Sequence, residues 1–559
     1  MFALLYVLCA LANIFSIFLC FKGGSFSYFA SILSLAFTLT FTFFSFLYNT
    51  KKKVEHYPVL KKLAEYLPLV LMACFVFSSV NAKEKYTLDA LSAILWLTIA
   101  FCTIALLFVM REKKMKAKHP HVKPKERRGK VLFLIIDWLD AIVQAACIVL
   151  LLQFFIFQLY LIPSESMVPT FMIGDRVVGL KFMAGPTFPL SSFRFPQLRS
   201  YKRGDVVIVR NPNYEDDAKN DLKFFTSQLI QILSLTYLNI NTDKSGRIKT
   251  DPLVKRIVAC PAEKVMLVDG VLYIKKAGEK DWKVQDESAY VLWNVDDLPE
   301  TEKRYVRDRK VDGEMLGMLT SVEDARRNLD FRQALKEANT LVDEMALTKG
   351  VPDTTLIMEE IIKKEDLSLD NLILKDLEIA SKILTLNGSL AWFSAFMTDW
   401  ASYWETRSEE ATLYEKRFAQ LNALIKLTVG RLLVKDVELL KSNLSSAQVF
   451  DSQERQGLLS ELRTYYYYLA LSGQRNMNEF PKGEGIYIPE GAFFMMGDNR
   501  FNSTDLRHGY TMYRTSVDAS DPLSIRYQTN LKPRYVKENR LLGLASFIFW
   551  PKARVGHVR

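Results

Sequence analysis

The stretch Ala145–Thr170, AACIVLLLQFFIFQLYLIPSESMVPT, passes from a long apolar run directly into a turn that contains two serines. The run begins near residue 131 and ends near residue 160, and a bilayer core needs about 20 apolar residues. Its roughly 30 residues would extend about 45 Å as a helix, so we expect Asp137 and Asp140 in its first turns at the inner headgroups. Ser166 then follows closely behind the exit of a membrane span, at the outer membrane surface.

Four further apolar runs precede this span, near residues 2–21, 27–48, 67–83 and 89–110. The first has no basic segment before it and no small-residue cleavage site after it, so we interpret it as a retained anchor. The sequence therefore predicts a multi-span α-helical membrane anchor.

The net charge of the chain is +11, and many of its lysine and arginine residues lie in two loops beside the spans, 51–62 and 111–130. Lysine and arginine accumulate on the cytoplasmic side of membrane proteins, so both loops are predicted to be cytoplasmic. With five spans, the N-terminus is then inside and the chain after residue 160 is outside. This distribution favours membrane orientation over nucleic-acid binding as the reason for the charge.

Three segments carry residues that together predict a serine–lysine hydrolase: Pro163–Thr170, Asp251–Val258 and Gly497–Arg507. A serine hydroxyl needs a base at neutral pH, and none of these segments contains a histidine. Lys255 lies in a short apolar run that alternates like a strand, which would place its amine among apolar side chains. Burial favours the neutral amine, so Lys255 is the candidate base for Ser166.

The same three segments resemble the sequence boxes of type I signal peptidases, which remove signal peptides from exported proteins. The resemblance covers roughly residues 150–290 and 484–559 and includes Lys202–Val207 and Ile488–Gly497. It implies Ser166 as nucleophile, Lys255 as general base, and an oxyanion hole made by the Ser164 hydroxyl and the Ser166 backbone N–H. It further implies that Ser503 orients the lysine and that Asp505 and Arg507 form a supporting ion pair.

The family cleaves after a small residue, with another small residue two positions earlier. The expected walls of the corresponding pockets are Ile162, Pro163, Leu253 and Val254. The sequence departs from the family pattern at Glu165, at Cys260–Glu263 and at His508–Met512, which affects pocket and turn shape but removes no catalytic atom.

The resemblance implies cleavage of exported precursor proteins at the outer, periplasmic side of a bacterial cytoplasmic (inner) membrane. Lipid surrounds the spans, and no cofactor, metal or nucleic acid is expected. A self-cleaving serine–lysine repressor is disfavoured by the apolar runs. An inactive peptidase-like scaffold or receptor, whose helical insertion binds a partner, is disfavoured because both Ser166 and Lys255 are present.

Five parts are expected along the chain. Residues 1–130 contain four transmembrane helices and 131–160 the fifth, while 161–296 and 484–559 form a mainly antiparallel β catalytic domain. Gly-Asp turns followed by β-branched residues indicate its strands, and Asp269-Gly270 indicates a hairpin. A smaller insertion occupies 213–250, and its apolar run 224–240 is interpreted either as an interfacial helix or as one packed on the catalytic domain.

Residues 297–483 are predicted to be an all-α insertion. Apolar residues recur at steps of four and three through Phe331, Leu335, Ala338, Val342 and Met345, with Gly350 as a stop. Ser321 and Asp324 have the spacing of a capping box. The aromatic residues at 392–404 and 465–468 are expected mainly in its core. We interpret the insertion as a self-packed unit that tunes the choice of substrate or of a secretion-machinery partner and could be replaced by a short linker between Asn294 and Gly483.

Overall fold

A computed structural model describes residues 2–558 apart from 24, 51–52, 80–85, 112–113, 116, 118–129, 192, 215–217, 235–237, 244–245, 293–294, 305, 307–312, 351–361, 364–366, 407–412, 476, 481–486 and 501. The chain divides into two compact units that are interleaved in sequence. The anchor unit contains Met1–Ile162, Gly174–Val254 and Asn539–Val558, and the site unit contains Pro163–Ile173 and Lys255–Glu538. Most of the predicted basic loop 111–130 lies outside the described residues, whereas of 51–62 only 51–52 do, and Tyr57–Lys62 belong to the first turns of a helix rather than to a loop.

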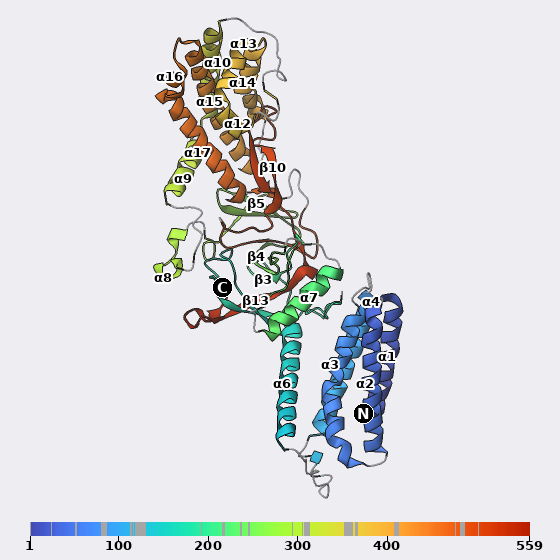
Figure 1. Cartoon of the computed structure of the whole chain (residues 1–559). Helices are drawn as coiled ribbons and strands as arrows, with labels where there is room; N and C mark the ends of the chain where they lie inside the picture. Colours follow the sequence, from blue (N-terminus) through green and yellow to red (C-terminus); the bar gives the residue numbers. More distant parts are fainter. Residues whose placement is uncertain are drawn as a thin grey trace. The chain divides into compact units, whose positions relative to one another are not determined.

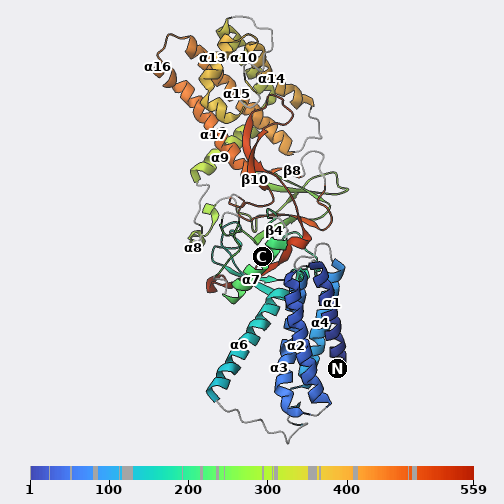
Figure 2. The same ribbon diagram turned by 45° about the vertical axis from the view of Figure 1, so that its right-hand side comes forward.

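The anchor unit begins with helices that pack on one another through a shared apolar core (Figure 1). They are α1 (Phe2–Gly23), α2 (Ser25–Asn49), α3 (Tyr57–Ser79) and α4 (Tyr86–Val109), with a short 3-10 turn at Val54–His56, and α6 (Lys130–Phe155) follows. Figure 2 shows α1 to α4 side by side from a second direction. Among the described residues, four helical segments are long and apolar enough to cross a membrane: Phe2–Leu19, Tyr28–Asn49, Thr87–Val109 and Leu134–Phe155. These helices confirm the predicted apolar anchor.

The remaining expected span, 67–83, lies largely within α3, which is not among those four segments. The helix starts earlier than its apolar run and carries Lys61, Lys62 and Glu65 in its first half and Pro68 in its interior. Its side chains are nevertheless buried against the neighbouring helices, including Leu67, Leu71 and Phe75. The count of five spans therefore stays a prediction.

The expected span at 131–160 was too long at its C-terminal end. Helix α6 ends at Phe155, and Phe157–Leu161 forms strand β1, paired antiparallel with β2 (Arg176–Leu180). A continuous apolar run does not show where a helix ends and a buried strand begins. Within Phe157–Leu161 the one strongly polar residue is Gln158, which is buried on the strand.

The anchor unit also contains an antiparallel ladder in the order β1-β2-β13-β3. Strand β3 is Val206–Val209, β13 is Leu541–Trp550, and β14 (Gly556–His557) pairs with β13. Helix α7 (Ala218–Leu233) lies in the predicted insertion 213–250. Phe225 of α7 stacks on Phe154 at 5.6 Å, and Asp221 pairs with Arg210 just after β3. Helix α7 is thus packed within this unit, and contact of 224–240 with lipid stays a prediction.

The site unit contains several antiparallel ladders. Strands β4 (Leu253–Ala259), β9 (Ala492–Met496) and β12 (Val536–Lys537) are neighbours, with Leu253 and Val254 of β4 assigned to the anchor unit. A second ladder has the order β7-β6-β5-β8, from Lys283–Gln285, Val271–Lys276, Glu263–Val268 and Met477–Phe480. β5 and β6 form the hairpin predicted around Asp269-Gly270. β10 (His508–Ser516) and β11 (Arg526–Leu531) form a further hairpin.

The helices of the site unit confirm the predicted helical region, but not that 297–483 is all-α, because β8 (Met477–Phe480) lies at its C-terminal end and pairs with β5. They are α8 (Glu300–Lys303), α9 (Gly313–Arg327), α10 (Phe331–Lys349), α12 (Leu369–Leu374), α13 (Asp376–Thr385), α14 (Ser389–Thr406), α15 (Leu413–Lys441), α16 (Ser446–Phe450) and α17 (Gln453–Arg475). Trp392, Phe393, Phe396 and Trp400 are buried, as expected, whereas Tyr466 and Tyr467 are exposed.

These helices do not form a core of their own, contrary to the interpretation of a self-packed unit. Met266 and Val268 of β5 and Val517, Ile525 and Tyr527 of the β10–β11 hairpin belong to the same buried apolar cluster as the helices. The periodic pattern identified which faces are apolar but not the strands that cover them.

Candidate active site

The candidate base lies on a buried strand. In β4, Arg256 and Ile257 are opposite Met496 and Met495 of β9, and all residues from Lys255 to Ala259 are buried. Only 4% of the Lys255 surface is exposed. The strand therefore holds the lysine amine away from water, but because both of its faces are buried here, and not through the alternation expected from the sequence.

The candidate nucleophile sits in a tight turn directly opposite this lysine. The turn is closed by backbone hydrogen bonds from Val168 N to Glu165 O (3.1 Å) and from Phe171 N to Met167 O (2.9 Å). The Lys255 Nζ lies 2.9 Å from the Ser166 Oγ, within hydrogen-bonding distance. The Ser164 Oγ lies 3.4 Å from the Ser166 Oγ on the exposed side of the turn. Residues far apart in sequence thus form a Ser–Lys pair with a second hydroxyl beside it.

The Lys255 amine is tuned toward its neutral form. Burial lowers the pKa of Lys255 to about 8, although the carboxylates of Asp505 and Asp498 act in the opposite direction. Desolvation disfavours the ammonium ion, so the dominant cause is the one expected for a lysine that accepts a proton.

The Gly497–Arg507 loop closes over the nucleophile's turn, and its first residue must be glycine. A Cβ added at Gly497 would lie 2.3 Å from the Ser166 carbonyl oxygen and 2.1 Å from the Ser503 Oγ. Asn499 N donates to the same Ser166 carbonyl at 3.3 Å. The side chain of Ser503 is buried beside Gly497, but its hydroxyl has no hydrogen-bond partner among the described residues. Orientation of Lys255 by Ser503 therefore stays a prediction.

Asp505 and Arg507 form a buried, two-pronged ion pair within this loop. Arg507 Nε and Nη2 lie 2.9 and 3.0 Å from the two Asp505 carboxylate oxygens. Asp505 also accepts the backbone N–H of Gly497 at 2.9 Å. Burial alone would raise the pKa of Asp505, but the Arg507 guanidinium and the neighbouring His508 hold it well below its usual range. The pair ties the two ends of the loop together.

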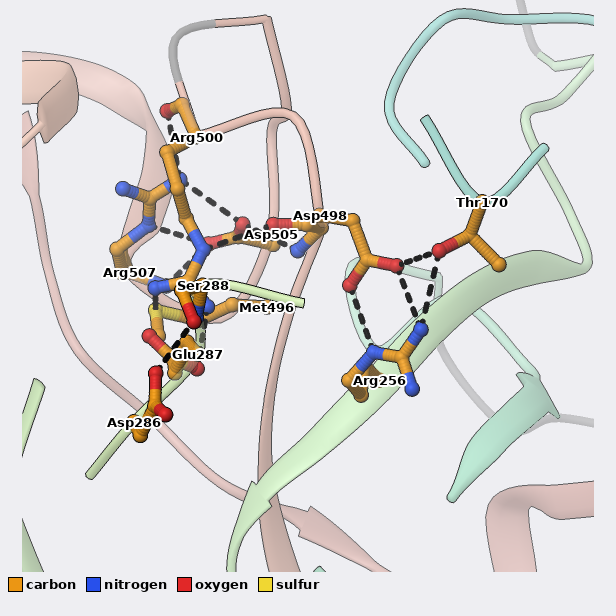
Figure 3. A network of polar contacts seen from close by, with 11 residues as sticks. Thr170, Arg256, Asp286, Glu287, Ser288, Met496, Asp498, Arg500, Asp505 and Arg507 are labelled. Atoms are coloured by element: carbon orange, nitrogen blue, oxygen red, sulfur yellow. Dashed lines mark hydrogen bonds and ion pairs between the residues drawn. The ribbon is translucent and has the colours of Figure 1, made fainter. Parts of the chain in front are cut away.

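A second ion pair, which the sequence reasoning missed, joins the base strand to the loop. Arg256, next to Lys255, donates to both Asp498 oxygens at 2.9 and 2.8 Å, and Thr170 Oγ1 donates to the same carboxylate (Figure 3). The Arg256 guanidinium also lies 4.0 Å from the centre of the Tyr290 ring. Asp498 thus connects the base strand, the nucleophile's turn and the loop. Its position in the sequence segment Gly497–Arg507, between Gly497 and Asn499, was the only indication of this role in the sequence.

Two further contacts of the Gly497–Arg507 loop were not predicted from the sequence. Arg500 Nη2 lies 2.6 Å from Glu287 Oε1, and both side chains are buried. Glu165, one of the departures from the family pattern, accepts a hydrogen bond from Asn502 Nδ2 at 3.0 Å. In Figure 3, Asp498 lies in the middle, with Arg500, Asp505 and Arg507 on one side of it and with Arg256 and Thr170 on the other side.

The residues expected to line substrate pockets are divided between the units. Pro163 is an exposed residue of the site unit, beside the Ser164–Ser166 turn. Ile162, Leu253 and Val254 belong to the anchor unit, where Ile162 is buried and the other two are half-buried. Their role as pocket walls stays a prediction.

Residues 135–320 match a family model described as signal peptidase, peptidase S26. This region contains the Ser166 turn and the Lys255 strand, whereas the Gly497–Arg507 loop lies beyond it. The match agrees with the resemblance of the Ser166 and Lys255 segments to type I signal peptidases.

Curated relatives are similar over limited stretches. Signal peptidase I of Buchnera aphidicola subsp. Baizongia pistaciae is 39% identical over 66 residues, which are 12% of this chain and 21% of that protein. Signal peptidase I of Rickettsia bellii (strain OSU 85-389) is 26% identical over 146 residues, 25% of this chain and 38% of that protein. Signal peptidase I of Pseudomonas fluorescens is 24% identical over 202 residues, 33% of this chain and 68% of that protein. The chain thus spans only about a fifth of the length of the Buchnera relative.

Proposed function

We propose that this chain, which carries a signal peptidase region of the peptidase S26 family, is a membrane-bound serine endopeptidase that removes N-terminal signal peptides from exported precursor proteins. The observation that carries the proposal is the 2.9 Å separation of Lys255 Nζ and Ser166 Oγ, with the lysine buried. The proposed substrates follow from the name of the matched family and of the curated relatives, signal peptidase I.

In the acylation step, neutral Lys255 accepts the proton of the Ser166 hydroxyl while the Ser166 Oγ attacks the scissile carbonyl carbon. Negative charge develops on the carbonyl oxygen, where the Ser166 backbone N–H and the Ser164 hydroxyl are the proposed donors. The protonated lysine then gives its proton to the departing amine, and the peptide bond breaks. The signal peptide remains on Ser166 as an ester.

In the deacylation step, Lys255 is again neutral and accepts a proton from a water molecule that attacks the ester carbonyl. The lysine returns this proton to the Ser166 oxygen as the acyl bond breaks, which releases the signal peptide as a carboxylic acid. The two buried ion pairs, Arg256–Asp498 and Asp505–Arg507, supply no proton in this scheme and hold the reacting groups in place.

The pH dependence of the reaction should show a rising limb with a midpoint near pH 8, because the base must be unprotonated and burial lowers the pKa of Lys255 to about 8. Below this pH the ammonium form dominates and cleavage falls about tenfold per pH unit. The value of kcat/KM for a short signal-peptide substrate in detergent, measured from pH 6 to 10, tests the assignment. A rate that is flat between pH 6 and 9 would contradict it, provided that the protein stays folded over this range.

We further propose that the protein lies in a bacterial inner membrane with the site on the periplasmic side. The basic segments 51–62 and 111–130 can share one side only if α3 and α4 both cross or neither does. Thr87–Val109 of α4 is long and apolar enough to cross, so α3 must cross as well. With Tyr57–Lys62 on the cytoplasmic side, the remaining residues 63–79 of α3 extend about 26 Å at 1.5 Å per residue, close to the thickness of a bilayer core.

In intact spheroplasts, added protease should cut the exported part and leave the basic loops protected. The informative fragment is the one that retains α1 to α6 and loses the α9–α17 segment. A cytoplasmic marker protein must stay intact as the control. Protection of the helical segment, with cleavage in 111–130, would show the reverse orientation.

A further inference from the structure

Residues 286–292, named here the strap, follow β7 and precede the helical segment. The strap contains a turn in which Tyr290 N and Val291 N donate to the Glu287 carbonyl at 3.1 and 3.0 Å. The turn directs Glu287, Tyr290 and Leu292 toward three different parts of the site. The strap lies outside the three sequence segments that predicted the chemistry.

The Glu287 side chain holds Arg500 in place. The two charged groups are 2.6 Å apart, and the exposed fractions of the Glu287 and Arg500 side chains are 7% and 0%. Arg500 Nε also donates to the Gly497 carbonyl at 3.1 Å. Glu287 thus fixes an arginine that braces the start of the Gly497–Arg507 loop.

The backbone of Leu292 continues this contact along the loop. Leu292 N donates to the Asp498 carbonyl at 2.9 Å, and Arg500 N donates to the Leu292 carbonyl at 3.1 Å. These two hydrogen bonds form a parallel bridge between Leu292 and Asn499. The conformation of residues 498–500 therefore depends on the strap.

The other two parts of the site contact the strap through side chains. The Tyr290 ring lies under the Arg256 guanidinium, 4.0 Å from the ring centre, and Arg256 neighbours the candidate base. Leu292 is buried in an apolar cluster with Val168 and Met172, which belong to the turn that carries Ser166 and its continuation. The base strand, the nucleophile's turn and the loop each touch the same seven-residue segment.

We propose that the strap is a positioning element of the active site and that Glu287 and Tyr290 are positioning residues, acting on Lys255 and Ser166 through Arg500 and Arg256. The inference rests on the proposed function and deepens it. A buried ion pair is by itself weak evidence for stability, since apolar residues of similar volume often replace one without loss. The strap, however, contacts every part of the site, so we assign the Glu287–Arg500 pair a role in positioning the reacting groups. A displacement of about 1 Å in such groups can lower a rate about 10²-fold.

Substitutions in the full-length, detergent-solubilised protein test the proposal. Glu287→Ala should lower kcat for a signal-peptide substrate about 10²-fold with KM changed less than about twofold, because the bound substrate is unchanged but the reacting groups are misplaced. Glu287→Gln keeps an acceptor for Arg500 and should lower kcat only about tenfold. Tyr290→Phe keeps the ring and should match the wild type, whereas Tyr290→Leu should lower kcat about fivefold. The control is Glu279→Gln, which removes a carboxylate from the exposed Lys283 pair and should have no effect.

Hydrogen–deuterium exchange gives a readout that does not depend on cleavage. The backbone amides of 497–507 should exchange about tenfold faster in Glu287→Ala than in the wild type or in Glu279→Gln. The variant loses one charged hydrogen bond that holds this loop, which raises the equilibrium constant for local opening by about that factor. Unchanged exchange in this loop, or equal kcat for Glu287→Ala and the wild type, would overturn the proposal. If the wild type cleaves no precursor, the proposed function fails and the exchange arm alone decides the role of the strap. If Glu287→Ala does not fold, Glu287→Gln and Tyr290→Leu decide it.

Discussion

Ser166→Ala and Lys255→Met should each abolish cleavage of a signal-peptide substrate by the detergent-solubilised protein. The first change removes the attacking oxygen, and the second removes the group 2.9 Å away that accepts its proton. A positioned general base contributes about 10²–10⁴-fold, and loss of the nucleophile removes the acylation route altogether. Because both residues serve the same step, the double variant should be no slower than Ser166→Ala alone.

Methionine is the informative substitution at Lys255, because it fills a similar volume and is at home in the apolar surroundings of a side chain that is 4% exposed. Lys276→Met, at the exposed end of β6, is the matched control and should cleave at the wild-type rate. Membrane extraction and unfolding temperature show whether each variant is folded. Normal processing by a folded Ser166→Ala or Lys255→Met protein would refute the dyad and leave the inactive scaffold as the better interpretation.

Sequence periodicity predicted elements well where one face of a helix is buried. The pattern from Phe331 to Met345 corresponds to α10, and Gly350 ends it in the left-handed conformation with φ 76°. The expected capping box at Ser321 was wrong, because Ser321 lies inside α9 and its hydroxyl donates to the Met318 carbonyl. The actual cap of α10 is Asp330, whose carboxylate accepts from the N–H groups of Arg332 and Gln333. A capping spacing recurs within helices by chance, so it locates a boundary only together with a break in the apolar pattern.

At the candidate site, the sequence predicted which residues come together better than it predicted the contacts that support them. Ser166 and Lys255 are brought together as the chemistry of a weak nucleophile and a desolvated amine requires, and Asp505 pairs with Arg507 within their own short segment. Glu287 was not predictable, because a glutamate between an edge strand and a helical segment resembles any solvated loop residue. Its importance comes from a partner more than two hundred positions away, and single-sequence patterns carry no information about such contacts.

The division of labour between the helical segment and the site must also be reconsidered. The apolar periodicity of the helices predicts a self-packed unit, so that a linker between Asn294 and Gly483 would preserve peptide cleavage. In the structure, Val268 and Tyr527 are buried by those helices and would become exposed. Loss of activity after such a deletion could therefore report an unfolded β5 or β10–β11 hairpin. A single contact between the two parts provides a cleaner test.

Lys426→Met should destabilise the site unit by about 3–5 kcal/mol, because it leaves a buried carboxylate without its counter-ion. Lys426 of α15 and Asp521 between β10 and β11 are both fully buried, with Nζ and Oδ2 2.5 Å apart. Asn422 Nδ2 remains as a donor to the same oxygen at 2.7 Å but carries no charge. Intrinsic fluorescence during thermal unfolding, at one scan rate, measures the change through Trp392 and Trp400, which lie in the same core. The double variant Lys426→Met/Asp521→Asn should recover most of the lost stability.

The matched control is Arg431→Gln on the same helix. The side chains of Arg431 and its partner Glu337 are 39% and 36% exposed, so the loss should be within about 1 kcal/mol. Below its transition temperature, Lys426→Met should cleave a signal-peptide substrate within about twofold of the wild-type rate. The reason is that the hairpin joins the candidate site at His508, far from Asp521. There the Asp505–Arg507 pair and the hydrogen bond from Gly497 N to Asp505 hold the loop without any contact to Asp521. A fall in kcat while Lys426→Met is still folded would show that the helical segment shapes the active site through this hairpin. Unchanged stability would instead mean that Asp521 becomes neutral or hydrated in the variant, so that the pair does not hold the hairpin on the helices.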